Sequence, residues 1–161
     1  MMRGRARRLA VATTLTAAAV VVVAAGLGAC TNTDAADQQV IDRLLTLDVL
    51  SVPPGAAELS RTSAKGGGNA AIRNSSTATV VYASPRTPAE VGQDVHAKFD
   101  AQWRFIDNRG GPIGGWQGSG ALASDPGTVA NVVARAVASG DKAPAGSRSV
   151  VTVTVSATRP G

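Results

Sequence analysis

The chain has 161 residues, which allows one ordinary domain, and its single cysteine excludes an intramolecular disulfide. A net charge of +5 would suit a nucleic-acid-binding protein, but four of the 16 basic residues lie in the first eight positions. From Cys30 onward, 12 basic residues stand against 11 acidic ones, so no nucleic-acid partner is expected.

The first 29 residues have the three regions of an export signal in the usual order. Residues 1–8 contain no acid and four basic side chains, Arg3, Arg5, Arg7 and Arg8. An apolar core follows over residues 9 to about 25, and small residues precede Cys30. Because positive charge stays on the cytoplasmic side, the chain after this signal is expected outside the cytoplasm.

The segment Leu27-Gly28-Ala29-Cys30 resembles the lipobox of bacterial lipoprotein precursors. The resemblance implies that a signal peptidase recognises Leu27, Gly28 and Ala29 and cuts before Cys30. It also implies that the Cys30 thiol carries diacylglycerol, with acyl chains such as palmitate, and that in some bacteria the new amino group is acylated too. Two acyl chains hold a protein stably on a membrane. The protein is therefore expected on the extracytoplasmic face of the cell membrane.

Two other interpretations of this segment remain open. Cys30 could be a buried cysteine of a folded core, although nothing around it has a core pattern. Residues 9–29 could instead be an uncleaved membrane anchor, since they approach the length that spans a bilayer. Arginine outnumbers lysine 13 to 3, a usage typical of GC-rich genomes such as those of actinobacteria.

A polar tether is predicted next, formed by lipidated Cys30 and residues 31–39, with a single domain over residues 40–161. Extended at about 3.3 Å per residue, this tether would lift the domain some distance from the lipid. The tether is shorter if Asp34 caps a helix over about residues 35–47. Five apolar residues fit one face of that helix: Val40, Ile41, Leu44, Leu45 and Leu47.

Two strands are predicted before the middle of the chain. Val52-Pro53-Pro54-Gly55 ends the first helix, because its prolines remove donors and its glycine permits a turn. Residues 57–63 and 77–83 are predicted strands, the second rich in Thr and Val. Residues 63–76 between them contain three consecutive glycines and are predicted to form a loop.

The clearest helix begins at Thr87. Thr87-Pro88-Ala89-Glu90 is a capping box with proline at the first helical position. Val91, Val95 and Phe99 then recur at steps of four and predict one buried stripe.

Four segments complete the chain. Residues 103–107 are a predicted strand with Trp103 and Phe105 on one face, whereas the glycine-rich residues 108–120 are predicted to be irregular. Asp125-Pro126 is typical of a helix start, and the valines and alanines over 129–137 fit a helix ending at Gly140. Residues 149–157 alternate Val with Thr or Ser, the pattern of a strand with one buried face.

These elements predict an α+β domain, a mostly antiparallel sheet of about four strands with two or three helices on one face. A ferredoxin-like arrangement is one candidate.

Few residues could carry chemistry. His96, the single histidine, could be an oriented general base with Asp94 or Asp100, or simply a surface imidazole on a solvated helix face. No second histidine or further thiol joins it, so neither a metal nor a cofactor is expected. Trp116 could stack on a ligand or close its loop over the core, and burial is favoured.

Two functions follow from these observations. The first is a non-catalytic lipoprotein that binds another envelope protein, a lipid or a cell-wall component. The alternative is a small envelope hydrolase that uses His96 with Asp94 or Asp100.

Overall fold

A computed structural model describes residues 31–67, 74–99, 102–107 and 114–158. The signal segment, Cys30 and Asp100 lie outside these ranges. In chain order the elements are α1 (Thr31–Leu45), the 3-10 helix η1 (Asp48–Leu50), β1 (Ala57–Ala64), β2 (Ser76–Ser84), α2 (Pro88–Phe99), β3 (Trp103–Asp107), β4 (Trp116–Leu122), β5 (Asp125–Ala136) and β6 (Ser149–Ala157).

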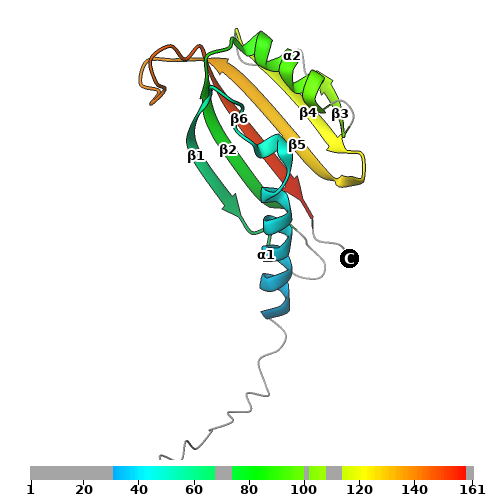
Figure 1. Ribbon diagram of the computed structural model, residues 1–161. Coiled ribbons are helices and arrows are strands. Elements are labelled where there is room, and N and C mark those ends of the chain that lie inside the picture. Colours follow the sequence, from blue (N-terminus) through cyan, green and yellow to red (C-terminus); the bar gives the residue numbers. More distant parts are fainter. Residues whose placement is uncertain (1–30, 68–73, 100–101, 108–113, 159–161) are drawn as a thin grey trace, which may run out of the picture.

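The fold is α+β, and one antiparallel sheet has the strand order β1-β2-β6-β5-β4-β3 (Figure 1). The expected class and strand direction are therefore confirmed, but the sheet has six strands rather than about four. The ferredoxin-like arrangement is wrong, since that fold alternates β-α-β-β-α-β, whereas here two strands precede α2 and four follow it.

Both α-helices pack on one face of the sheet, as expected (Figure 1). Helix α1 contacts β2 and β6, whereas α2 contacts β3, β4, β5 and β6. Alternate residues of the central strands point toward the helices and form the core, because side chains alternate across a strand. These inward residues include Val80 in β2, Val132 in β5 and Val153 in β6.

Helix α1 begins at Thr31, so residues 31–39 are helical rather than extended, and the alternative of a helix over about residues 35–47 comes closer to the observed Thr31–Leu45. The helix is fixed to the loop after β1 by two contacts. Lys65 Nζ lies 2.8 Å from Asp34 Oδ1, and the Gly67 amide donates to Asp37 Oδ2 at 3.1 Å. Asp37 is buried there. Polar residues that lack apolar periodicity can therefore still form a helix when their side chains bind a neighbouring loop.

Helix α2 begins as its sequence predicts. The Thr87 amide donates to Glu90 Oε2 at 2.7 Å, and the Glu90 amide donates to Thr87 Oγ1 at 3.3 Å. This reciprocal pair is a capping box, which satisfies amides that have no partner within the helix. Val91, Val95 and Phe99 are buried, and the predicted stripe is confirmed.

Strand β4 corrects the prediction that residues 108–120 are irregular, because Trp116–Leu122 pairs with both β3 and β5. Gly118 and Gly120 occupy two inward positions of this strand. A Cβ at Gly118 would lie 2.6 Å from Trp116 Cη2, and one at Gly120 would lie 3.0 Å from Phe105 Cγ. The glycines leave room for two aromatic rings, so in this strand they mark close packing rather than a loop.

Strand β5 corrects a second prediction. Residues 125–136 form a strand and not a helix, and Asp125 Oδ2 accepts a hydrogen bond from Thr128 Oγ1 at 2.7 Å close to the start of that strand. Both faces of β5 carry apolar residues, so no alternation is visible in its sequence. Its valines favour a strand because β-branched side chains lose rotamer freedom in a helix.

In the described part of the chain, no helix is long and apolar enough to cross a membrane.

Candidate binding cleft

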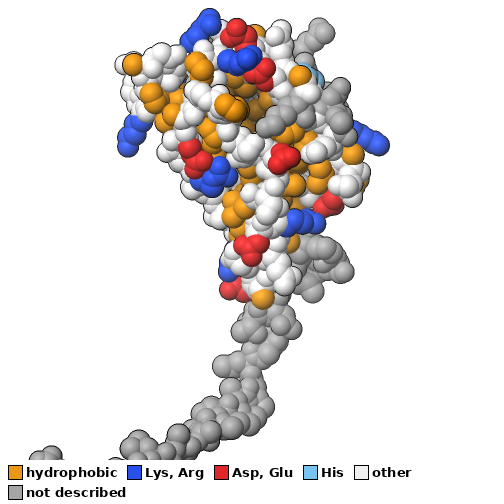
Figure 2. All heavy atoms as spheres, in the orientation of Figure 1, with side chains coloured by type: hydrophobic (Ala, Val, Ile, Leu, Met, Phe, Trp, Pro, Cys, Tyr) orange, Lys and Arg blue, Asp and Glu red, His pale blue; other side chains and the backbone are white. Residues whose placement is uncertain are grey.

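A cleft lies on the helical side of the sheet, between α2 and the segment that leads from η1 to β1. Its volume is about 80 Å³. The lining is mostly apolar and includes Val49, Val91, Val95, Phe99, Val132 and Val153. Figure 2 shows hydrophobic side chains gathered in the centre of this face of the molecule, with charged groups around them.

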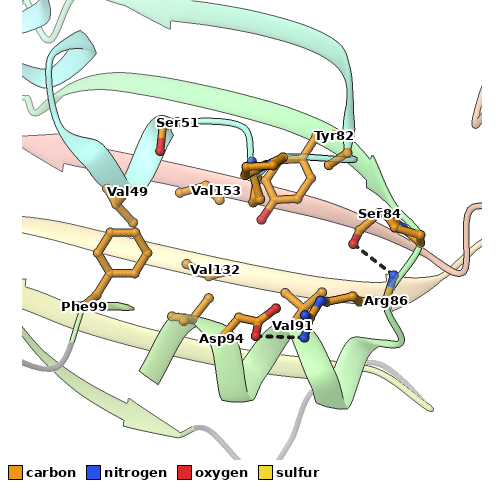
Figure 3. Close-up of a pocket in the computed structure, with 15 residues that line it drawn as sticks. Val49, Ser51, Tyr82, Ser84, Arg86, Val91, Asp94, Phe99, Val132 and Val153 are labelled. Carbon is orange, nitrogen blue, oxygen red and sulfur yellow. Dashed lines mark hydrogen bonds and ion pairs between the residues drawn. The ribbon is translucent and has the colours of Figure 1, made fainter. Parts of the chain in front are cut away.

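The turn after η1 shapes one wall of the cleft. The Ala56 amide donates to the Pro53 carbonyl at 3.1 Å, and Gly55 has a φ of +81°, which favours glycine. Pro53, Pro54 and Ala56 all line the cleft. At one end of the cleft Val49 lies next to Phe99 (Figure 3). The Val-Pro-Pro-Gly sequence therefore keeps this wall in place without adding charge to it.

Tyr82 is the main polar group inside the cleft. It comes from β2, is only 5% exposed, and turns its hydroxyl toward the space between the valines (Figure 3). Within the described residues this hydroxyl forms no hydrogen bond. Burial, followed by the charge of Asp94, raises the pKa of Tyr82 to about 12. At neutral pH the phenol is therefore protonated and can donate a hydrogen bond.

Two charged residues stand at the mouth. Arg86 Nη1 donates to Asp94 Oδ1 at 3.0 Å, and the Arg86 amide donates to Ser84 Oγ at 3.1 Å (Figure 3). Arg86 and Asp94 are the charged residues that line the cleft, and their charges offset each other. Because both side chains are about half exposed, this ion pair contributes little to stability.

The structure does not bring His96 and Asp94 together. The two residues are two positions apart on α2, a spacing that places side chains on different faces of a helix. Asp94 points to Arg86, whereas the His96 ring packs edge-on against Trp116, with ring centroids 6.1 Å apart. Asp100, the other proposed partner, lies outside the described residues. Over the same described ranges, no group of His, Cys, Asp or Glu side chains could hold a metal ion.

Trp116 is half-buried and packs against the core, which agrees with the favoured interpretation of this residue. Its indole lies between Gly92 of α2 and Gly118 of β4, where a Cβ at either glycine would lie 2.6 Å from the ring. The ring therefore joins α2 to the sheet and does not line the cleft.

Neither Tyr82 nor Arg86 was predicted from the sequence as a functional residue, although both line the cleft. Tyr82 has the same strand parity as Ala78 and Val80, but the sequence predicted only that residues 77–83 form a strand. One signal was available, since a tyrosine on an inward strand face brings a hydroxyl that needs either a partner or an opening. The proposed lipidation residues Leu27, Gly28, Ala29 and Cys30 lie outside the described residues.

Comparison of the chain with models of protein families, with curated proteins and with solved structures finds no match.

Proposed function

We propose that this protein is a lipid-anchored binding module on the extracytoplasmic face of the cell membrane, with its ligand site in the cleft beside Tyr82. The observation that carries the binding site is Tyr82, a residue only 5% exposed, whose hydroxyl faces an apolar cleft and has no hydrogen bond within the described residues. A ligand acceptor that pairs with this hydroxyl, while its apolar part displaces water from the valine lining, combines one polar contact with apolar burial at a single site.

The anchor is supported by the leader and by the position of α1. Cys30 directly precedes this helix, whose 15 residues span about 22 Å. Val49 of the cleft follows the opposite end of α1. A lipid on Cys30 would therefore hold the protein at one end of the helix and leave the cleft near the other, away from the acyl chains.

Binding is proposed rather than hydrolysis because of the contacts around the suggested catalytic residues. Asp94 is engaged by Arg86, and His96 packs on Trp116 instead of lining the cleft. A general base must lie within hydrogen-bond reach of the substrate proton that it abstracts, and His96 does not line the cleft in which a substrate would bind.

The anchor is tested by expressing wild-type protein and Cys30→Ser, separating membrane from soluble fractions, and measuring intact masses. The wild-type mass is expected to lack residues 1–29 and to include a diacylglycerol. The serine variant is expected without lipid, because a hydroxyl is a far weaker nucleophile than a thiolate. Ser139→Ala, at an exposed position, is the control and should behave as wild type. A wild-type protein that keeps its leader and carries no lipid would contradict the lipid anchor and support an uncleaved transmembrane anchor.

A further inference from the structure

We infer that the cleft takes a short branched alkyl group of an uncharged ligand, whose neighbouring carbonyl oxygen accepts a hydrogen bond from Tyr82. This inference rests on the proposed function, because it names the ligand class of the same cleft. Three observations lead to it: the volume of the cleft, the balance of its charges and the state of the Tyr82 hydroxyl.

The volume limits the size of the group that enters. A cavity of about 80 Å³ is roughly half the volume of one that holds benzene. The cleft therefore has room for two or three heavy atoms, the size of an isopropyl group. Sites for whole small molecules are several times larger. The rest of the ligand has to remain outside the mouth.

The lining selects an apolar group without charge. Val91, Val132 and Val153 offer only methyl groups to the occupant. Arg86 and Asp94, the charged lining residues, already bind each other at 3.0 Å. A carboxylate or an ammonium group placed among these valines would lose its hydration, and the Arg86–Asp94 pair, whose two charges offset each other, supplies no net charge to compensate it.

Tyr82 sets the polar requirement. Its hydroxyl is a donor at neutral pH, so the matching group is an acceptor such as a carbonyl oxygen. Ser84 Oγ already accepts from the Arg86 amide, and Ser51 Oγ donates to the Asp48 carbonyl, so these two neighbours are partly engaged. One acceptor beside a small alkyl group is the arrangement that fills the cleft and pairs its hydroxyl.

Isobutyramide has this chemistry, since an isopropyl group adjoins a neutral carbonyl. Isobutyrate has the same shape with a negative charge, and isopropylammonium has the alkyl group with a positive charge. The full protein, purified as it occurs and with its valine methyl groups labelled, is titrated with each probe and followed by NMR. Saturable shifts of the Val91, Val132 and Val153 methyl signals are expected with isobutyramide. Both ions should bind at least tenfold more weakly.

Tyr82→Phe removes the donor and keeps the ring, so it should weaken isobutyramide binding about three- to tenfold. Thr77→Val is the matched control, because it removes a hydroxyl from the opposite face of the same strand and should leave binding unchanged. Equal affinity of Tyr82→Phe and wild type would overturn the role of the hydroxyl. Tighter binding of either ion would overturn the uncharged class while keeping the cleft as a binding site.

Titration with N-acetylvaline N-methylamide, which carries the same isopropyl group on a peptide-like backbone, distinguishes a peptide ligand from a free small molecule. Much tighter binding than isobutyramide supports a peptide ligand, and similar binding supports a free small molecule. Absence of any saturable shift at the three valines overturns both the ligand class and the binding site. The anchor is judged separately from the intact mass, so a missing lipid leaves the ligand class standing.

Discussion

The indole of Trp116 occupies the space that a side chain at Gly92 would need, since a Cβ at Gly92 would lie 2.6 Å from Trp116 Nε1. Helix α2 can therefore approach β4 closely only with glycine at this position. Glycine in a helix interior normally costs about 1 kcal/mol relative to alanine. At Gly92 this cost is offset because the missing side chain leaves room for the Trp116 ring between α2 and the sheet.

Gly92→Ala is expected to destabilise the protein by about 1–3 kcal/mol, because overpacking outweighs the better helix propensity of alanine. Thermal unfolding measures the change. Gln93→Ala, at the exposed neighbouring position, should have little effect. Combining Gly92→Ala with Trp116→Leu should cost less than the sum of the two single changes, because both act on one contact. Strict additivity would contradict the proposed clash.

Tyr82 is the single tyrosine in the chain, so phenolate absorbance reports on it alone. We expect that titration to have its midpoint near the pKa of about 12 caused by burial and by Asp94, well above the ordinary 10.0. Between these two values the unfolded chain loses its phenolic proton while the folded protein keeps it. The contribution of protonated Tyr82 to the free energy of unfolding is therefore fully present below pH 10. It falls by about 3 kcal/mol as the pH rises to 12. Tyr82→Phe should lack this alkaline component, and a midpoint near 10 would show an open site.

The Arg135 guanidinium and the Ala138 amide both donate to the carboxylate of Asp141, at 2.6 to 2.7 Å. They lower the pKa of Asp141 to about 2, with the Arg135 contact as the larger cause. This contact stabilises the fold above the ordinary pKa of 3.8 and is lost as pH falls through about 2. The Ala138 amide signal in NMR should titrate with a midpoint near 2. Asp141→Asn should abolish that titration, and a wild-type midpoint near 3.8 would argue against the contact.

Val95 and His96 are adjacent on α2 but differ in burial. Val95 is buried on the stripe that faces the sheet, whereas His96 is half-buried beside Trp116. Val95→Asp places an unpaired charge in the core and should lower the unfolding free energy by several kcal/mol. His96→Ala removes one edge contact and should cost about 1 kcal/mol. Similar melting temperatures of the two variants would contradict the assignment of these helix faces.

The sequence predicted elements whose pattern repeats regularly. Thr87 and Glu90 predicted the start of α2, and alternation in residues 149–157 predicted β6 with its observed bounds. Strands β4 and β5 were missed because their local signals compete with tertiary packing. Gly118 and Gly120 are typical of loops until the rings of Trp116 and Phe105 are placed beside them.

The cleft could not be predicted for a similar reason. Val49, Tyr82 and Val153 are far apart in the chain, and each is typical of a core by itself. Only the strand order brings β2 next to β6, and only the spacing of η1 and α2 leaves Tyr82 partly uncovered. The sequence pattern specified which residues turn inward but not which of them the helices would fail to cover.

Strand β6 follows every other strand in the chain and yet lies between β2 and β5 in the sheet. Strand β2 (residues 76–84) can pair with β1 early, but its pairing with β6 requires residues 149–157 near the end of the chain. Pairings between such distant segments form slowly, because the intervening chain must first be closed into a loop. During synthesis the sheet therefore stays incomplete until β6 has been made. For a protein proposed to lie outside the cytoplasm, the strand order thus keeps the central pairing of the sheet open until the last strand has been made.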